Sequence, residues 1–319
     1  MRNILNDLTK KVLDGEEISR EEALMLYDVP LDELKKAADR IRQKFMGSAF
    51  DICTIINGKS GMCSEDCKFC AQSCRNHTDI KRYPLLSTEE IVKAAVKNHE
   101  AGMMRFSIVT SGKRLSDEEV DRMCETVKAI KRACPISVCV SFGLLNEEQF
   151  RKLKEAGVSR VHNNLESSER YFAKVCSTHT YDEKKKAIAE ACLAGLEVCS
   201  GGLVGMGESR EDRIDMALTL RDLEIGSVPV NMLNPIPGTP FGDLPKMEYE
   251  EFVRTIAIYR FILPKAFIRL AGGRGLMEDK GRECFLSGAD AAISGDMLTT
   301  SGITAQSDKE LIDSLGFHI

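Results

Sequence analysis

The alternation of short β-rich runs with helical stretches constrains this chain more than any other feature. It begins at Asp51 and continues to Ser294, and the helices between the strands have visible starts, such as the capping boxes at Ser87, Ser116 and Thr180. Eight strands separated by helices favour a single (β/α)8 TIM-type barrel of the α/β class over a doubly wound sheet. The predicted strands are Asp51–Ile56, Met103–Val109, Ile136–Ser141, Val158–His162, Glu197–Gly201, Val228–Met232, Ala266–Leu270 and Ala291–Ser294.

The rest of the chain reads as helical extensions of that barrel. Residues 1–48 carry a capping box at Ser19 and a 3.6-residue apolar period over Leu31–Met46. The sequence therefore predicts an N-terminal helical extension over 1–48, the barrel over 49–305, and a C-terminal helical tail over 306–319.

Side-chain alternation along the predicted strands places polar groups inside the barrel. In Ile136–Ser141 the apolar residues Ile136, Val138 and Val140 should face the helices, which turns Cys139 inward. A barrel interior is ordinarily filled by Val, Ile and Leu. Unpaired polar groups there cost about 1–3 kcal/mol each, so this interior is expected to bind something. The same alternation turns inward Arg105, Ser107, Ser137, Ser141, His162, Asn164, Cys199, Asn231 and Arg269.

Composition narrows the class of protein. The 319 residues carry a net charge of −5 and contain no apolar run long enough to span a bilayer. The mild acidic balance disfavours nucleic-acid and anionic-membrane partners. A polar, amphipathic N-terminus stands where a signal peptide would have its apolar region, so a cytoplasmic protein is expected. In that reducing compartment the 12 cysteines are expected to be metal ligands, catalytic groups or small core residues.

Three cysteines lie close together just after the first strand. Cys63, Cys67 and Cys70 have the spacing C-x3-C-x2-C, and Cys74 follows after three more residues. Three thiolates can hold a [4Fe–4S] cluster and leave one iron open for a substrate or cofactor. A structural zinc with Cys74 as fourth ligand and a chance grouping of buried cysteines are the alternatives. In a (β/α)8 barrel this loop lies at the C-terminal mouth, where active sites are found.

The spacing around Phe69 resembles the signature of radical S-adenosylmethionine (SAM) enzymes. Within that superfamily, segments 60–73, 164–166, 199–208, 228–233, 269–274 and 294–300 resemble the biotin synthase family in the same order. The resemblance implies a [4Fe–4S] cluster on Cys63, Cys67 and Cys70, with SAM chelated to its open iron. It also implies sulfur insertion into dethiobiotin, driven by a 5′-deoxyadenosyl radical, with sulfur drawn from a second iron–sulfur cluster in the barrel.

Further site residues follow from the same resemblance. SAM contacts are expected from Phe69, His162, Glu166, Val204 and Glu208. Glu166 stands at the acidic position near the ribose, where the family usually has the shorter Asp. Asn164 and Asn231 match asparagines that hold the ureido group of dethiobiotin, and an amide side chain can donate and accept hydrogen bonds at once.

The second cluster is expected to depart from the family pattern. Cys139, Cys199 and Arg269 match three of its usual ligands, but the fourth position is Ser107, and a hydroxyl is a poor ligand for a sulfide cluster. The cluster could be absent, be a [2Fe–2S] centre with a substitute ligand, or be a larger cluster with another thiolate. The third outcome is favoured, with Cys74 as the extra thiolate.

Alternative functions are another radical SAM enzyme of the same barrel group, such as a hydrogenase-cofactor maturase, or a non-catalytic iron–sulfur or zinc protein. The polar barrel interior disfavours the non-catalytic reading. The family resemblance further implies an electron donor of flavodoxin or ferredoxin type and a homodimer.

Overall fold

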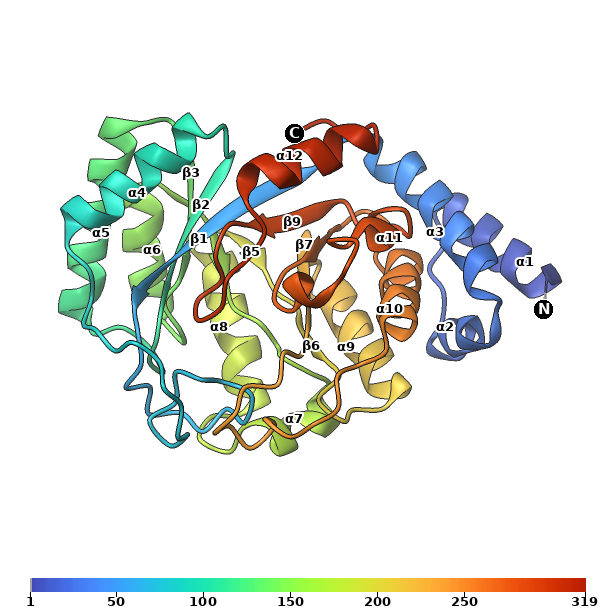
Figure 1. Ribbon diagram of the computed structural model, residues 1–319, viewed down its shortest axis with the longest axis horizontal. Helices are drawn as coiled ribbons and strands as arrows, with labels where there is room; N and C mark the ends of the chain where they lie inside the picture. Colours follow the sequence, from blue (N-terminus) through green and yellow to red (C-terminus); the bar gives the residue numbers. More distant parts are fainter. Residues whose placement is uncertain (1) are drawn as a thin grey trace.

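A closed barrel of parallel strands forms the centre of the molecule in a computed structural model that describes residues 2–319 (Figure 1). The sheet order is β5-β4-β3-β2-β1-β9-β8-β7-β6, and a further β5–β7 pairing closes the ring. All eight predicted strands are present, so the predicted fold class is confirmed. The strands are β1 (Asp51–Lys59), β2 (Arg105–Thr110), β3 (Ser137–Ser141), β4 (Val158–His162), β5 (Glu197–Cys199), β6 (Gly202–Val204), β7 (Ser227–Met232), β8 (Phe267–Leu270) and β9 (Ala291–Ser294).

The fifth predicted strand, Glu197–Gly201, ends at Cys199 as β5, and β6 follows as a further short strand beyond the predicted range. Cys199 of β5 pairs with Ser227, and β6 then pairs with β7 from Gly202 onward. Between them Gly201 packs so tightly that an added Cβ would lie 2.0 Å from the carbonyl oxygen of Pro229. Only glycine permits this close approach, and β5 and β6 keep the same register with β7 on either side of it.

Helices surround the barrel on its outer side (Figure 1). The capping boxes at Ser19, Ser87, Ser116 and Thr180 are confirmed, with each side chain accepting from the backbone N–H three residues on. The helices are α1 (Arg2–Leu13), α2 (Arg20–Met25), α3 (Leu31–Met46), α4 (Thr88–Glu100), α5 (Asp117–Ala133), α6 (Glu147–Ala156), α7 (Glu169–Val175), α8 (Tyr181–Leu193), α9 (Arg210–Asp222), α10 (Tyr249–Ile262), α11 (Arg282–Phe285) and α12 (Ala305–Ser314), with 3-10 turns η1 (Leu26–Asp28) and η2 (Arg274–Leu276).

The C-terminal segment pairs with the residues that precede β1. The backbone N–H of Phe50 donates to the carbonyl of His318 at 2.8 Å, and the N–H of His318 donates to Ser48 at 2.7 Å. The predicted division at residues 48 and 305 stays a prediction. No helix within residues 2–319 is long and apolar enough to cross a membrane.

Candidate active site

One cavity of about 400 Å³ joins the cysteine loop to the barrel interior. The outward residues Val138 and Val140 are completely buried against the helices, as the alternation along β3 predicts. The predicted inward residues line the cavity instead, except Ser137, which is not part of its lining. Its lining includes Arg105, Ser107, Cys139, Ser141, His162, Asn164, Cys199, Asn231 and Arg269.

The mouth of the cavity carries the three predicted loop cysteines. Cys63, Cys67 and Cys70 all line it and are partly buried. The loop is folded on itself, since the N–H of Cys70 donates to the carbonyl of Cys67 at 3.0 Å. Burial raises the pKa of the Cys70 thiol to about 11, so binding a metal here must displace protons. Three soft donors on one short loop fit an iron–sulfur cluster with an open iron.

Cys74 lies apart from the barrel cysteines. It is exposed and is not among the described residues that line the cavity. Its backbone N–H donates to the carbonyl of Cys63 at 2.8 Å, which keeps it at the outer side of the loop. The structure therefore does not bring Cys74 together with Cys139 and Cys199, contrary to the expectation from its position in the sequence.

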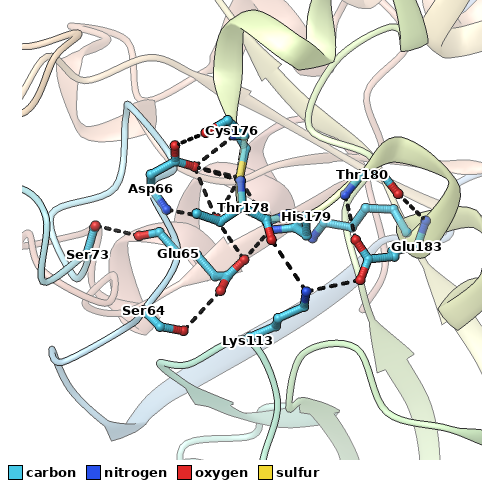
Figure 2. A network of polar contacts seen from close by, with 12 residues as sticks. Ser64, Glu65, Asp66, Ser73, Lys113, Cys176, Thr178, His179, Thr180 and Glu183 are labelled. Carbon is cyan, nitrogen blue, oxygen red and sulfur yellow. Dashed lines mark hydrogen bonds and ion pairs between the residues drawn. The ribbon is translucent and has the colours of Figure 1, made fainter.

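A polar network fastens the cysteine loop to the segment between α7 and α8 (Figure 2). Asp66 accepts from the backbone N–H of Ser177 at 2.8 Å, and Glu65 accepts from the Thr178 hydroxyl at 2.8 Å. Burial alone would raise the pKa of Asp66, but the hydrogen bonds from Ser177 hold it well below its usual range. An ionised Asp66 thus anchors the loop that presents Cys67.

The network contains a cysteine and a histidine that sequence reasoning did not assign. Figure 2 shows Cys176 beside His179, with its Sγ 3.3 Å from His179 Nδ1. His179 Nδ1 also lies 2.6 Å from a carboxylate oxygen of Glu65. Donor atoms of Cys67, Cys176 and His179 all fall within 4.8 Å of one another. The C-x2-H spacing of Cys176 and His179 was the one sequence pattern that could have pointed to them. Because Cys67 also belongs to the loop triad, these groups surround that triad and form no separate site.

The predicted SAM contacts divide into two groups. Phe69, His162 and Glu166 line the cavity. Glu166 adopts a left-handed backbone conformation, with φ 71°, which is uncommon for a residue with a side chain and is often found at functional sites. Burial raises the pKa of Glu166, and burial lowers that of His162 to about 4, so His162 is neutral at pH 7.

Val204 and Glu208 lie outside this lining. Val204 is completely buried, and both carboxylate oxygens of Glu208 are used within the protein. They accept from the backbone N–H groups of Gly205 and Met206, at 2.8 and 2.7 Å, and Arg213 Nε donates at 2.7 Å. The expected cofactor contact from these two side chains is therefore replaced by a role in shaping the turn after β6.

The two predicted asparagines face the same cavity. Asn164 Oδ1 lies 2.8 Å from His162 Nε2 and accepts from the N–H of Gly201 at 3.1 Å. Asn231 donates to the carbonyl of Gly202 at 3.0 Å and accepts from the N–H of Gly272 at 2.7 Å. Asn231 retains one N–H and one acceptor lone pair that can face a ligand. Both lone pairs of Asn164 Oδ1 are used, and one of its N–H groups donates to Glu166 at 3.3 Å, so Asn164 retains a single N–H.

A cluster of buried ion pairs is centred on Asp51, two residues before Cys53 on β1. The carboxylate of Asp51 pairs with Arg105 at 3.3 Å, with Arg160 at 3.0 Å and with Arg269 at 3.2 Å. Sequence reasoning turned Arg105 and Arg269 inward but missed Asp51 and Arg160, although Arg160 shares the strand parity of His162. It also missed Cys53 of β1, which lines the cavity.

Comparison with known proteins identifies related chains along the full length. The Radical SAM superfamily matches residues 59–220, and the Biotin and Thiamin Synthesis associated domain matches residues 229–318. A protein named biotin synthase from Clostridium botulinum (strain Alaska E43 / Type E3) is 52% identical over 99% of this chain and 100% of its own. A protein of the same name from Brachyspira hyodysenteriae is also 52% identical, over 99% of this chain and 95% of its own.

Solved structures resemble the fold at lower identity. Methylornithine synthase has a TM-score of 0.83 and 21% identity, covering 97% of this chain and 96% of its own. The FeFe-hydrogenase maturase HydG from Carboxydothermus hydrogenoformans has a TM-score of 0.83 and 18% identity, covering 99% and 79%. At these identities the likeness extends to the fold alone.

Proposed function

The chain belongs to the biotin synthase family of radical SAM enzymes, and on that premise we propose that it inserts sulfur into dethiobiotin to form biotin. Membership of the superfamily implies a [4Fe–4S] cluster, SAM and a reductant. When bound, the mouth cluster and SAM supply a radical that abstracts hydrogen from the substrate, and a barrel cluster supplies the sulfur.

The observation that carries this proposal is the single cavity that contains both cysteine groups. Cys63, Cys67 and Cys70 lie at its mouth, and Cys139 and Cys199 lie on its inner strands. A substrate between the two groups would be near both the hydrogen-abstracting and the sulfur-donating ends. A radical reaction requires that water be kept out, and the surrounding strands exclude it.

The protein's own side chains position the reactants. Asn231 offers a donor and an acceptor to a cyclic urea, and Asn164 offers its remaining N–H donor. Glu166 offers carboxylate oxygens to the ribose hydroxyls of SAM, and Phe69 offers an aromatic face to its adenine. Neutral His162 fixes Asn164 without adding charge to the chamber.

For the second cluster we propose a centre larger than [2Fe–2S], with the sulfur donor bound at an open iron. Ser107 offers no thiolate, whereas Cys139 and Cys199 remain. Three guanidinium groups face buried Asp51, and Arg160 also pairs with the exposed Glu197 at 2.9 Å, which leaves an excess of one positive charge. Burying that charge is unfavourable unless an anion offsets it, as a thiolate-ligated cluster would.

Anaerobic incubation with SAM, dithionite and dethiobiotin tests the function. We expect both 5′-deoxyadenosine and biotin from the wild type, and background levels of both from Cys63→Ala, Cys67→Ala and Cys70→Ala, which lack a thiolate of the mouth cluster. Cys74→Ala is the matched control and should keep the mouth-cluster spectrum, whereas the zinc alternative requires Cys74.

The outcome separates the candidate classes. Release of 5′-deoxyadenosine without biotin would favour another radical SAM reaction, such as that of a maturase. An electron carrier would release neither product. Substantial SAM cleavage by Cys67→Ala would contradict the radical assignment itself.

The remaining expectations complete the proposal. We propose an electron donor of flavodoxin or ferredoxin type, a cytoplasmic setting and a homodimer, all carried over from the family resemblance. The three-part division of the chain at residues 48 and 305 also stays a proposal.

A further inference from the structure

The proposed second cluster lacks an assigned third thiolate. The thiols among the described residues that line the cavity are those of Cys53, Cys63, Cys67, Cys70, Cys139 and Cys199. Three of them belong to the mouth loop and two are already assigned to the barrel cluster. Cys53 on β1 is left, and it is buried, with 8% of its surface exposed.

Strand position places Cys53 together with the assigned ligands. The barrel strands in order are β1, β2, β3, β4, β5, β7, β8 and β9. Cys53 lies on the first, Cys139 on the third, Cys199 on the fifth and Arg269 on the seventh. Side chains that fill an eight-stranded barrel are arranged in layers of four, contributed by alternate strands. These four residues therefore satisfy the condition for one complete layer.

The hydrogen-bonded register confirms that they are level. Cys53 pairs with Arg105, and Arg105 pairs with Ser137, which is two residues before Cys139. The same two-residue step leads from Cys139 to Cys199, from Cys199 to Arg269, and from Arg269 back to Cys53. A uniform step of this size is the stagger by which strand tilt brings alternate strands to one height. The four side chains thus form a ring around the barrel axis.

Ser107 belongs to the neighbouring layer. It lies on the second strand, and the same step relates it to His162 on the fourth. The thiol that is missing at Ser107 is therefore replaced by one at Cys53. Cys53 lies on the adjacent strand, one layer further from the mouth of the barrel than Ser107.

Electrostatics are consistent with a shared site. Burial raises the pKa of Cys53 to about 12, charges on Cys139 and Cys199 raise it further, and Arg269 opposes the rise. Ser227 connects two ring members, since its hydroxyl lies 3.3 Å from Cys199 Sγ and 3.5 Å from Arg269 Nη2. Three thiols and a guanidinium in one layer of the same cavity suit a soft, anionic metal centre.

We propose that Cys53 supplies the third thiolate of the barrel cluster, so that Cys53, Cys139, Cys199 and Arg269 form its protein ligand ring. This inference rests on the proposed function, which supplies the need for a second cluster. The competing interpretation is that Cys53 is a small buried residue that only packs.

Iron counting and Mössbauer spectroscopy on anaerobically reconstituted full-length protein test the proposal. We expect about eight irons in the wild type, the sum of two four-iron clusters, and about four in Cys53→Ala and Cys53→Ser. Both variants should keep the mouth-cluster spectrum and release 5′-deoxyadenosine, but form no biotin. The matched control is Cys134→Ala, because Cys134 is a similarly buried thiol at the end of α5, outside the cavity lining.

A relocated thiolate separates ligand loss from misfolding. In the double variant Cys53→Ser, Ser107→Cys, the third thiolate moves to the adjacent strand, and we expect second-cluster iron to return. Wild-type iron content and spectrum in both single Cys53 variants would overturn the proposal. An equal iron loss in Cys134→Ala would also overturn it, since the effect would then reflect packing.

Failure of the proposed function has a different signature. A wild-type protein that binds only mouth-cluster iron and forms no biotin would refute the second cluster before any variant is compared. A [2Fe–2S] spectrum in the wild type would refute the larger cluster but would still be lost in Cys53→Ser if Cys53 is a ligand.

Discussion

At the residue scale, the two cavity asparagines illustrate how one amide can serve both the fold and a ligand. Asn231 bridges Gly202 and Gly272, which lie beside different strands. Asn164 is fixed by His162 and Gly201. Because these contacts lock each amide in one rotamer, the remaining N–H of each amide and the remaining lone pair of Asn231 are presented without further loss of side-chain entropy on binding.

Asn231→Ala and Asn164→Ala should each weaken dethiobiotin binding by about 1–3 kcal/mol, because ureido groups would be left without partners. Equilibrium dethiobiotin titration of the anaerobic holoprotein measures this change. SAM affinity and iron content serve as controls and should remain at wild-type values. Unchanged dethiobiotin affinity in both variants would contradict the assigned orientation of the substrate.

At the element scale, a buried carboxylate joins two neighbouring helices, α7 and α9. Asp212 of α9 accepts a hydrogen bond from the hydroxyl of Ser168, which immediately precedes α7, at 2.6 Å. It also accepts one from Nη2 of Arg170, which lies within α7, at 2.6 Å. Its side chain is 1% exposed. Although burial raises the pKa of Asp212, hydrogen bonds from Ser168 and Ser209 bring the net value below 3.8.

The lowered pKa predicts a pH-dependent effect of Asp212→Asn. A carboxyl group with a depressed folded-state pKa stabilises the fold above its unfolded value, here 3.8, and this contribution is lost as the pH falls through the folded value. At pH 7 the variant should lose about 1.5–3 kcal/mol, typical of hydrogen bonds to a charged group. Urea unfolding of the metal-free protein should show that the difference in unfolding free energy between the wild type and Asp212→Asn becomes smaller below about pH 4.

Glu211→Gln is the matched control for Asp212→Asn. Glu211 is the preceding, exposed residue of the same helix, so its replacement should change stability by less than about 0.5 kcal/mol. A gap between Asp212→Asn and the wild type that stays constant from pH 7 to pH 3 would show that charge is not the origin of the effect.

At the scale of the whole molecule, the C-terminal residues pack against both the N-terminal helices and the start of the barrel. The ring of Phe317 packs edge-on against Phe50, with centroids 5.3 Å apart, and the Arg42 guanidinium lies 4.5 Å from the Phe317 centroid. Phe50 immediately precedes β1, and Arg42 belongs to α3. One aromatic side chain therefore links the C-terminus to α3 and to the start of β1, near the opposite end of the sequence.

Phe317→Ala should reduce stability by about 3–5 kcal/mol, because it removes a buried ring and leaves a cavity among those regions. Denaturant unfolding of the metal-free protein measures the loss. His318→Ala is the control, since its side chain is exposed while its backbone bonds to Ser48 and Phe50 are retained. Equal stability of the two variants would contradict the packing role of Phe317.

Local pattern was sufficient to predict the strands, their inward faces and the mouth loop. Side-chain alternation is a property of each strand alone, so Cys139 and Arg269 were placed inside correctly. The loop cysteines lie within eight residues, which keeps them close in any fold. Glu208 could not be assigned in this way, because its backbone partners are set by the turn after β6.

Only the tertiary structure decided which residues of different strands lie in the same layer of the barrel. In the run from Asp51 to Ile56 each face carries one polar residue, Asp51 or Thr54, so its alternation does not reveal that Cys53 points inward. Cys74 lies near the mouth loop in sequence but outside the cavity lining, whereas Cys53 lines the same cavity as Cys139 and Cys199. The physical reason is closure: strand tilt and stagger determine which distant residues form one layer, and no single strand encodes them.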